Sequence, residues 1–164
     1  MRHQLTNNSV ILLAATLCAI VGVPPASLPA QTRPTATGCD ASLWRHVYNP
    51  SRLKEVTSCV TVSGIVEEST ADDDGDQHFL LKLDKGQKDL ANKRNRKKKG
   101  GALVVEIVCA NPVRLPKVGS ACAGYTNRIT IPKVGDRVSV TGSYVIDSHN
   151  GWAEVHPVSK LEIL

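Results

Sequence analysis

The chain has 164 residues, which leaves room for one compact domain and excludes a large multidomain enzyme. Hydrophobic residues make up 41% of the chain, enough for a buried core, whereas aromatic residues make up only 4% and leave few rings to stack on nucleobases. The net charge of +5 points to an anionic partner, but it comes from one short basic run, without which acidic residues slightly outnumber basic ones.

The N-terminus has the pattern of an export signal. Arg2 precedes the apolar run 10–23 with no acidic residue beside it, and small residues follow up to Ala30. This pattern predicts a secretory signal peptide over residues 1–30 and a secreted or periplasmic location. The run is shorter than the ~20 residues that a membrane-spanning helix needs, so we expect no stable membrane span after cleavage. Lipid attachment at Cys18 is a weaker alternative.

Four cysteines follow the predicted signal peptide, and they are Cys39, Cys59, Cys109 and Cys122. An even number of cysteines in an oxidising compartment predicts two disulfides. Three pairings are possible, and proximity in the sequence favours Cys39 with Cys59 and Cys109 with Cys122. A structural zinc site is the weaker alternative because the four are dispersed and no two have the CxxC spacing.

The segment before the first expected strand divides into two parts. Residues 31–38 are rich in Pro and Thr and have no hydrophobic periodicity, which predicts a disordered linker. In residues 39–58, four apolar or aromatic side chains are grouped as one turn of helix places them: Leu43, Trp44, Val47 and Tyr48. We therefore expect a short N-terminal helix or turn there.

Two strands joined by a turn come next. From Val60 the pattern changes to period two, and one face of the predicted strand carries Val60, Val62, Gly64 and Val66. The acidic run 72–76 predicts a turn into a second strand, whose apolar face carries Phe79, Leu81 and Leu83. The run is not an EF-hand loop, because its glycine is the fourth residue rather than the sixth.

The middle of the chain predicts one buried strand between two long loops. Residues 85–101 are polar and basic, which predicts a mobile loop. Residues 102–108 are nearly all apolar and β-branched, as expected of a strand covered on both faces, with Glu106 the charged exception. Residues 109–133 contain several prolines and glycines and predict a long connection.

Residues 135–146 alternate again and predict a fourth strand, and a tight turn at 147–151 leads to a last strand, 152–164, interrupted at Pro157.

Five strands with a long connection between the third and fourth predict an all-β fold: a small five-stranded OB-like Greek-key barrel over 39–164, with a short N-terminal helix or turn and long loops. Gly64 and Gly142 support this interpretation, since a glycine inside a strand often marks a bend or bulge. A two-sheet sandwich, the alternative, usually has about seven strands.

Several stretches resemble a family of uncharacterised secreted microbial domains that are OB-fold-like and end in His-Gly-Trp-x-Glu-Ile-His-Pro. They are CVTVSGIV (59–66), DGDQHF (74–79), LVVEIVC (103–109), VGDRVSVTGSYVID (134–147) and GWAEVHP (151–157). The resemblance covers residues 52–161 and implies an OB-like fold and export, without implying an activity. This chain has Asn150 where the family motif has its first His.

The last strand offers a candidate site. Period two places Trp152, Glu154 and His156 on one face of it. In an OB-type barrel the third strand lies beside the fifth, so we expect Glu106 near Glu154 or His156, with His78 joining them. Such carboxylates and imidazoles serve as ligand-binding groups, as metal ligands or as a general acid/base pair. The alternative interpretation is a surface cross-strand pair on the solvated face.

The basic run is a candidate anion-binding surface, with Lys93, Arg94, Arg96, Lys97, Lys98 and Lys99 as its cations. It predicts binding of an anionic polymer, either a nucleic acid or an acidic glycan, and the alternative is a solvated loop. We therefore predict a monomeric, non-enzymatic binding module for an anionic polymer or a small polar ligand, with no cofactor and no catalytic residue assigned. A metal-dependent hydrolase that uses the His/Glu cluster and a structural envelope domain without a small ligand are the alternatives.

Overall fold

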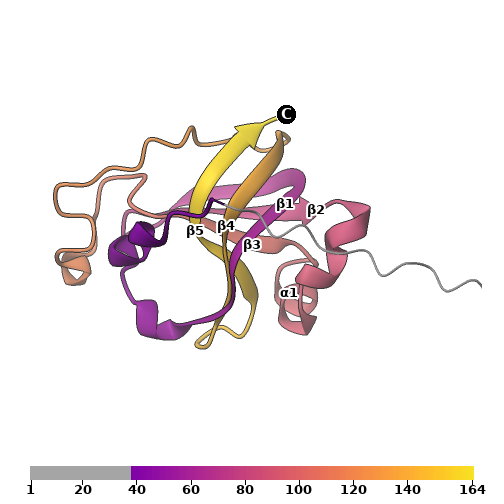
Figure 1. The fold of residues 1–164 in the computed structure, drawn as a ribbon, viewed down its shortest axis with the longest axis horizontal. Coiled ribbons are helices and arrows are strands. Elements are labelled where there is room, and N and C mark those ends of the chain that lie inside the picture. Colours follow the sequence, from indigo (N-terminus) through magenta and orange to yellow (C-terminus); the bar gives the residue numbers. More distant parts are fainter. Residues whose placement is uncertain (1–37) are drawn as a thin grey trace, which may run out of the picture. The chain divides into compact units, whose positions relative to one another are not determined.

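The computed structural model describes residues 38–164. The predicted signal peptide, 1–30, and the predicted linker, 31–38, lie outside the described residues except for Gly38. In the described part the helical segments are short and strands dominate, which confirms the expected all-β class (Figure 1). The strands are β1 (Leu53–Ala71), β2 (Gln77–Leu83), β3 (Leu103–Ile107), β4 (Arg137–Asp147) and β5 (Ala153–Ile163).

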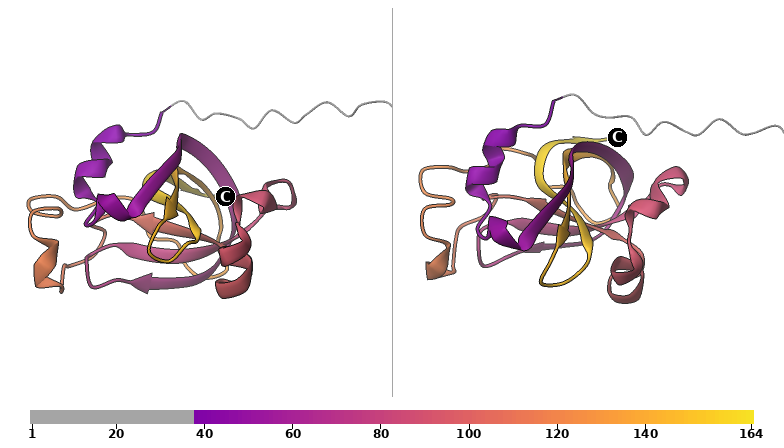
Figure 2. Two further views of the ribbon diagram at one scale, coloured as in Figure 1. Left: turned by 90° about the horizontal axis from the view of Figure 1, so that it is seen from below. Right: turned by 60° about the horizontal axis from the view of Figure 1, so that its bottom comes forward.

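The five strands form one mixed sheet that closes on itself. Hydrogen bonds join them in the order β1-β2-β3-β5-β4, and β4 pairs again with β1. All pairs are antiparallel except β3 and β5, which run parallel with Val104 opposite Glu154 and Val105 opposite Val155. Figure 2 shows the strands curving around a common interior. A closed sheet leaves few free edges for pairing with other chains.

Two strand glycines lie where neighbouring backbones approach too closely for a side chain. A Cβ at Gly64 would lie 2.2 Å from the carbonyl oxygen of Lys82, and one at Gly142 would lie 2.5 Å from that of Pro157. Gly142 also stands where the register between β4 and β5 shifts, as expected of a glycine that marks a bulge. The expected interruption of the last strand at Pro157 is wrong: β5 runs through it, and these register shifts absorb the irregularity.

The interior is filled by the predicted apolar faces. Alternate residues of β1, from Val60 to Val66, are buried, and so are Phe79 and Leu81 of β2. β3 is covered on both sides, as predicted, with Leu103, Val105 and Ile107 in the main core and Val104 in a second cluster. That second cluster also buries Leu80, against which Trp152 packs, so the outer face of β2 is covered at Leu80 while His78 and Lys82 on the same face stay polar.

The prediction of a mobile loop over 85–101 is wrong. The segment forms a 3-10 helix, η3 (Lys85–Leu90), followed by the α-helix α1 (Lys93–Lys98). The side chain of Asn92 caps α1, and Asn95 completes a capping box. Asn95 is fully buried, donates to the carbonyl oxygens of Ala102 and Ala153, and accepts from the backbone N–H of Ala153. The six predicted anion-binding cations therefore lie on an anchored helix and its C-terminal end.

The N-terminal segment, residues 39–53, has the expected short helices, which are η1 (Ala41–His46) and η2 (Pro50–Arg52). The first strand begins at Leu53, seven residues before the expected start at Val60. Both predicted disulfides are present, Cys39–Cys59 and Cys109–Cys122, and they indicate an oxidising, extracytoplasmic environment. Among the described residues no helix has the length and apolar character to span a membrane.

Candidate functional site

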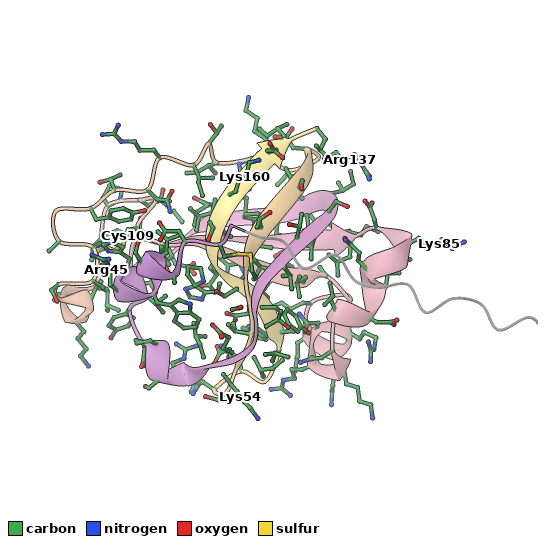
Figure 3. The ribbon with its side chains drawn as sticks, viewed as in Figure 1. Arg45, Lys54, Lys85, Cys109, Arg137 and Lys160 are labelled. Atoms are coloured by element: carbon green, nitrogen blue, oxygen red, sulfur yellow. A yellow bond between two sulfur atoms is a disulfide. The ribbon has the colours of Figure 1, made fainter. Side chains whose placement is uncertain are left out.

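A polar cavity of about 410 Å³ lies on the outer face of β2, β3 and β5, on the side opposite the main core. Its other walls come from the C-terminal half of β1, the turn 72–76, and residues 47–53 of the N-terminal segment. Figure 3 shows side chains filling the space between the N-terminal segment and the strands. We call this cavity the pocket.

Four predicted site residues come together in the pocket, with Glu106 in contact with His78 and His156, and Glu154 in contact with His156. Glu106 lies on β3 between His78 on β2, its direct cross-strand partner, and His156 on β5. Its two carboxylate oxygens lie 3.4 Å from Nδ1 of His78 and 3.3 Å from Nδ1 of His156. Glu154 Oε2 lies 3.4 Å from the same His156 nitrogen. The expected convergence of these side chains is therefore confirmed, whereas their role as ligand-binding residues stays a prediction.

The prediction that Trp152, Glu154 and His156 share one face is confirmed. Trp152 Nε1 donates a hydrogen bond to Glu154 Oε1, while the intervening Ala153 and Val155 lie in the main core. The alternative interpretation of a solvated surface pair is wrong, because Glu154 is only 2% exposed and His156 only 6%. The outer face of β5 is buried here because it lines a cavity whose other walls include the N-terminal segment and the turn 72–76.

Asp76 belongs to the site and was missed from the sequence. It is buried at the end of the acidic turn, and its Oδ1 accepts a hydrogen bond of 2.8 Å from the backbone N–H of Cys109. Its Oδ2 lies 3.7 Å from Nε2 of His156. The acidic run predicted a solvated hairpin turn, with loose calcium binding by that turn as the weaker alternative, and did not place Asp76 beside the histidines. Asp76 stands two residues before His78, and that proximity was the available signal.

Several buried groups of the pocket have shifted pKa values. Burial raises the pKa of Asp76 to about 7, although the nearby His156 opposes the shift. Burial by itself disfavours a charged His156, but Glu106, Glu154 and Asp76 outweigh it and raise the pKa of His156 to about 9. Burial also raises the pKa of Glu154. Perturbations of this kind cluster at functional sites, so they add weight to the pocket as the candidate site.

Glu106 and His78 form the second ionic contact of the pocket. Burial opposes ionisation of Glu106, but His156 and His78 outweigh it and hold the pKa of this carboxyl below its usual value. Burial likewise opposes a charged His78, and Glu106 and Asp72 together raise the pKa of this imidazole. Glu106 is thus the carboxylate that both histidines share.

Two buried polar atoms of described residues that line the pocket have no hydrogen-bond partner, and they are Arg52 Nε and His156 Nε2. His156 Nε2 is shielded from solvent and makes no hydrogen bond to any described residue. Its separation of 3.7 Å from Asp76 Oδ2 exceeds the usual hydrogen-bond length of about 2.7–3.2 Å. A buried nitrogen without a partner is costly, so a ligand group at this position would satisfy it.

Two three-residue groups in the pocket have donor atoms that lie within 4.8 Å of one another, as a metal ion requires. They are Asp76, Glu106 and His156, which is the more buried group, and Asp72, His78 and Glu106. Asp76 also lies near Cys109 and Cys122, but those two sulfurs are bonded to each other and are not thiolate ligands.

The basic helix lies at the rim of the pocket. Lys99 lines the pocket, with its Nζ 4.3 Å from the centre of the Trp152 ring. Arg94 donates to the carbonyl oxygen of Asn150 in the turn between β4 and β5, and Arg96 to that of Ala91. The remaining predicted anion-binding residues are exposed on the surface, and they are Lys93, Lys97 and Lys98.

Comparison with known proteins adds no family: no protein-family model matches the chain, and no curated protein matches it. The resemblance to secreted OB-fold-like domains therefore stays a prediction.

Proposed function

We propose that the protein is an extracytoplasmic binding module with an OB-like Greek-key barrel fold, and that the pocket holds a small polar ligand with positive charge. The strand order and the parallel pairing of β3 with β5 support the OB-like assignment, because that fold closes five strands in one Greek-key sheet. The two disulfides support export. Membership in the family of secreted OB-fold-like domains is part of the same proposal.

The observation that carries the ligand class is the charge of the pocket wall. Among residues 38–164, two permanent cations line the pocket, and one of them, Arg52, is paired with Asp147. Seven carboxylates line it: Glu68, Asp72, Asp74, Asp76, Glu106, Asp147 and Glu154. Even with both histidines charged, acidic groups are in excess. A wall of this kind attracts cations and repels anions.

The size and burial of the pocket fit the same ligand class. Its volume of about 410 Å³ falls in the range of about 300–1,000 Å³ that small-molecule sites occupy. The raised pKa values of Asp76 and Glu154, due first to burial, mean that the ionised carboxylates lack full compensation. A bound cation would stabilise the ionised form of both, so binding energy is available to a positively charged ligand.

The test compares cationic and anionic probes by calorimetry and thermal unfolding. Spermidine and MnCl2 represent the cationic class, and citrate the anionic class. We expect at least one cationic probe to bind saturably and raise Tm, and citrate to do neither.

Glu106→Gln removes the central carboxylate and should weaken binding of that cationic probe at least ~10-fold. Glu162→Gln, an exposed change on β5 outside the pocket, is the matched control and should leave binding unchanged. Binding of citrate alone, or equal binding by both variants, would contradict the proposal.

A second binding function, for an anionic polymer, is favoured by the exposed cations of α1. The exposed side chains are Lys93, Lys97 and Lys98, on a helix that the buried Asn95 anchors. We expect retention on heparin that falls with salt, and a variant with these three lysines changed to Gln should lower the salt slope by about 3.

The matched control for this surface changes three other exposed lysines to Gln, and they are Lys54, Lys117 and Lys133. It removes the same charge from scattered positions. Equal loss of retention in both variants would show that net charge and not α1 determines binding. If neither polymer nor cationic probes bind, the structural envelope domain becomes the better hypothesis.

A further inference from the structure

We propose that the pocket contains a site for one divalent transition-metal ion of the Zn²⁺ or Mn²⁺ kind, formed by Asp76, Glu106 and His156. This inference rests on the proposed cation-binding function and names the ligand class. Asp76 comes from the turn before β2, Glu106 from β3 and His156 from β5. The parallel pairing of β3 with β5 fixes the relative positions of the last two.

The donor set fits this class of ion. One donor atom from each of the three residues lies within 4.8 Å of the other two. Carboxylate oxygens together with imidazole nitrogen suit Zn²⁺ and Mn²⁺, whereas Ca²⁺ takes six to eight oxygen ligands. The set contains a nitrogen donor, so we expect preference for the transition metals over Ca²⁺.

The unpartnered nitrogen of His156 is the second, independent observation. Nε2 is buried, bonds to no described residue, and faces Asp76 Oδ2 at 3.7 Å. Two atoms that each bind one ion at about 2.1 Å lie at most ~4.2 Å apart, so this spacing is one that an ion can bridge and a hydrogen bond cannot.

The other ring nitrogen of His156 has the environment that metal-bound histidines need. Nδ1 faces two carboxylate oxygens, Glu106 Oε2 at 3.3 Å and Glu154 Oε2 at 3.4 Å, and Trp152 Nε1 holds the other oxygen of Glu154. Metal-ligating histidines generally donate their second N–H to a carboxylate, which orients the ring and directs the free nitrogen at the ion. Glu154 is thus a positioning residue, and the ring presents Nε2 toward Asp76.

The second group, Asp72, His78 and Glu106, is the weaker candidate. Its members are less buried, and His78 Nδ1 already lies 3.4 Å from Glu106 and 3.7 Å from Asp72. The two groups share Glu106, so when an ion occupies the buried group its carboxylate is already a ligand and the second group lacks one donor. We therefore expect a stoichiometry of one ion per chain.

The experiment titrates ZnCl2, MnCl2 and CaCl2 into chelator-treated protein by calorimetry. Zn²⁺ or Mn²⁺ should bind with a stoichiometry of one, and more tightly than Ca²⁺. Asp76→Asn keeps an oxygen for the Cys109 N–H and replaces the one that faces His156, so it should weaken binding at least ~10-fold. Glu162→Gln removes one charge from the exposed end of β5, outside the pocket, and should change binding less than ~2-fold.

A measurement on the unaltered protein keeps the test decisive if Asp76→Asn does not fold. Histidine ring signals followed by NMR should shift at His156 when Zn²⁺ is added and stay unchanged at His149, which is exposed. The inference is overturned if neither Zn²⁺ nor Mn²⁺ binds saturably, if Asp76→Asn and Glu162→Gln behave alike, or if His78 shifts in place of His156. Spermidine binding without metal binding would overturn the metal site alone, and absence of both would overturn the proposed function too.

Discussion

Arg52 holds the carboxylate of Asp147 at the start of the turn between β4 and β5. Asp147 accepts hydrogen bonds from the Arg52 guanidinium, the Asn150 side chain and the backbone N–H of His149. Burial alone would raise the pKa of Asp147, but these donors outweigh it and hold the pKa below its usual value. Arg52 and Asn150 also line the pocket, so the ion pair of Arg52 with Asp147 connects the N-terminal segment to the β4–β5 turn at the edge of the pocket.

The lowered pKa of Asp147 predicts a defined pH dependence of stability. A carboxyl with a lower pKa in the folded than in the unfolded state stabilises the fold above its unfolded value of about 3.9, and loses that contribution as pH falls through the folded value. Asp147→Asn should lower the free energy of unfolding at pH 7 by about 1–3 kcal/mol, and the difference from wild type should shrink below about pH 4. Urea unfolding followed by tryptophan fluorescence from pH 3 to 7 measures this.

Asp73 provides the control for that series, because its pair with Arg114 is exposed on both sides. Asp73→Asn should change stability by less than about 0.5 kcal/mol at any pH, as is usual for surface ion pairs. A constant difference between Asp147→Asn and wild type across the pH range would contradict the assigned role of Asp147.

At the scale of elements, α1 shows how a helix forms without an apolar face. Every residue of Lys93–Lys98 is polar, and the helix is too short to be stable alone. Asn92 caps its first turn, and the buried Asn95 replaces the usual apolar contact with hydrogen bonds to the backbone before β3 and at the start of β5. The sequence signal was the pair Asn92 and Asn95 at capping-box spacing, which the basic composition obscured.

The anchoring role of Asn95 predicts a large effect of its removal. Asn95→Ala leaves the backbone groups of Ala102 and Ala153 without partners in a dry environment, and should cost about 2–4 kcal/mol of unfolding free energy. Amide hydrogen exchange over α1 should rise in the same variant. Lys97→Ala, an exposed change on the same helix, should stay within about 0.5 kcal/mol. Similar losses in both variants would mean that the helix itself, and not Asn95, contributes the stability.

The strands were the predictable elements. Alternation located the buried faces of β1, β2 and β4, because a strand with one side in a core must repeat every two residues. It failed for the first seven residues of β1, where no residue from Leu53 to Cys59 is fully buried and periodicity gives no signal. It also failed for Leu80, which a second cluster covers from outside.

At the scale of the whole molecule, the pocket depends on segments that are far apart in the chain. The Cys39–Cys59 disulfide ties the start of the N-terminal segment to β1, and the Cys109–Cys122 disulfide lies beside Asp76, whose carboxylate holds Cys109 N–H. The segment therefore encloses a face of β5 that would otherwise be solvated. This enclosure turns a row of polar side chains into a buried charged site.

The sequence by itself determined the all-β class, the apolar faces of the strands and the common face of Trp152, Glu154 and His156, and it favoured, among three possible pairings, the disulfides that the structure shows. These follow from local rules, since strand periodicity and short cysteine spacing depend only on neighbouring positions. Only the tertiary structure decided that this face is buried, that Asp76 belongs to it, and that His156 keeps an unpartnered nitrogen. Burial and charge compensation depend on which distant segments pack against a residue, and periodicity carries no information about that packing.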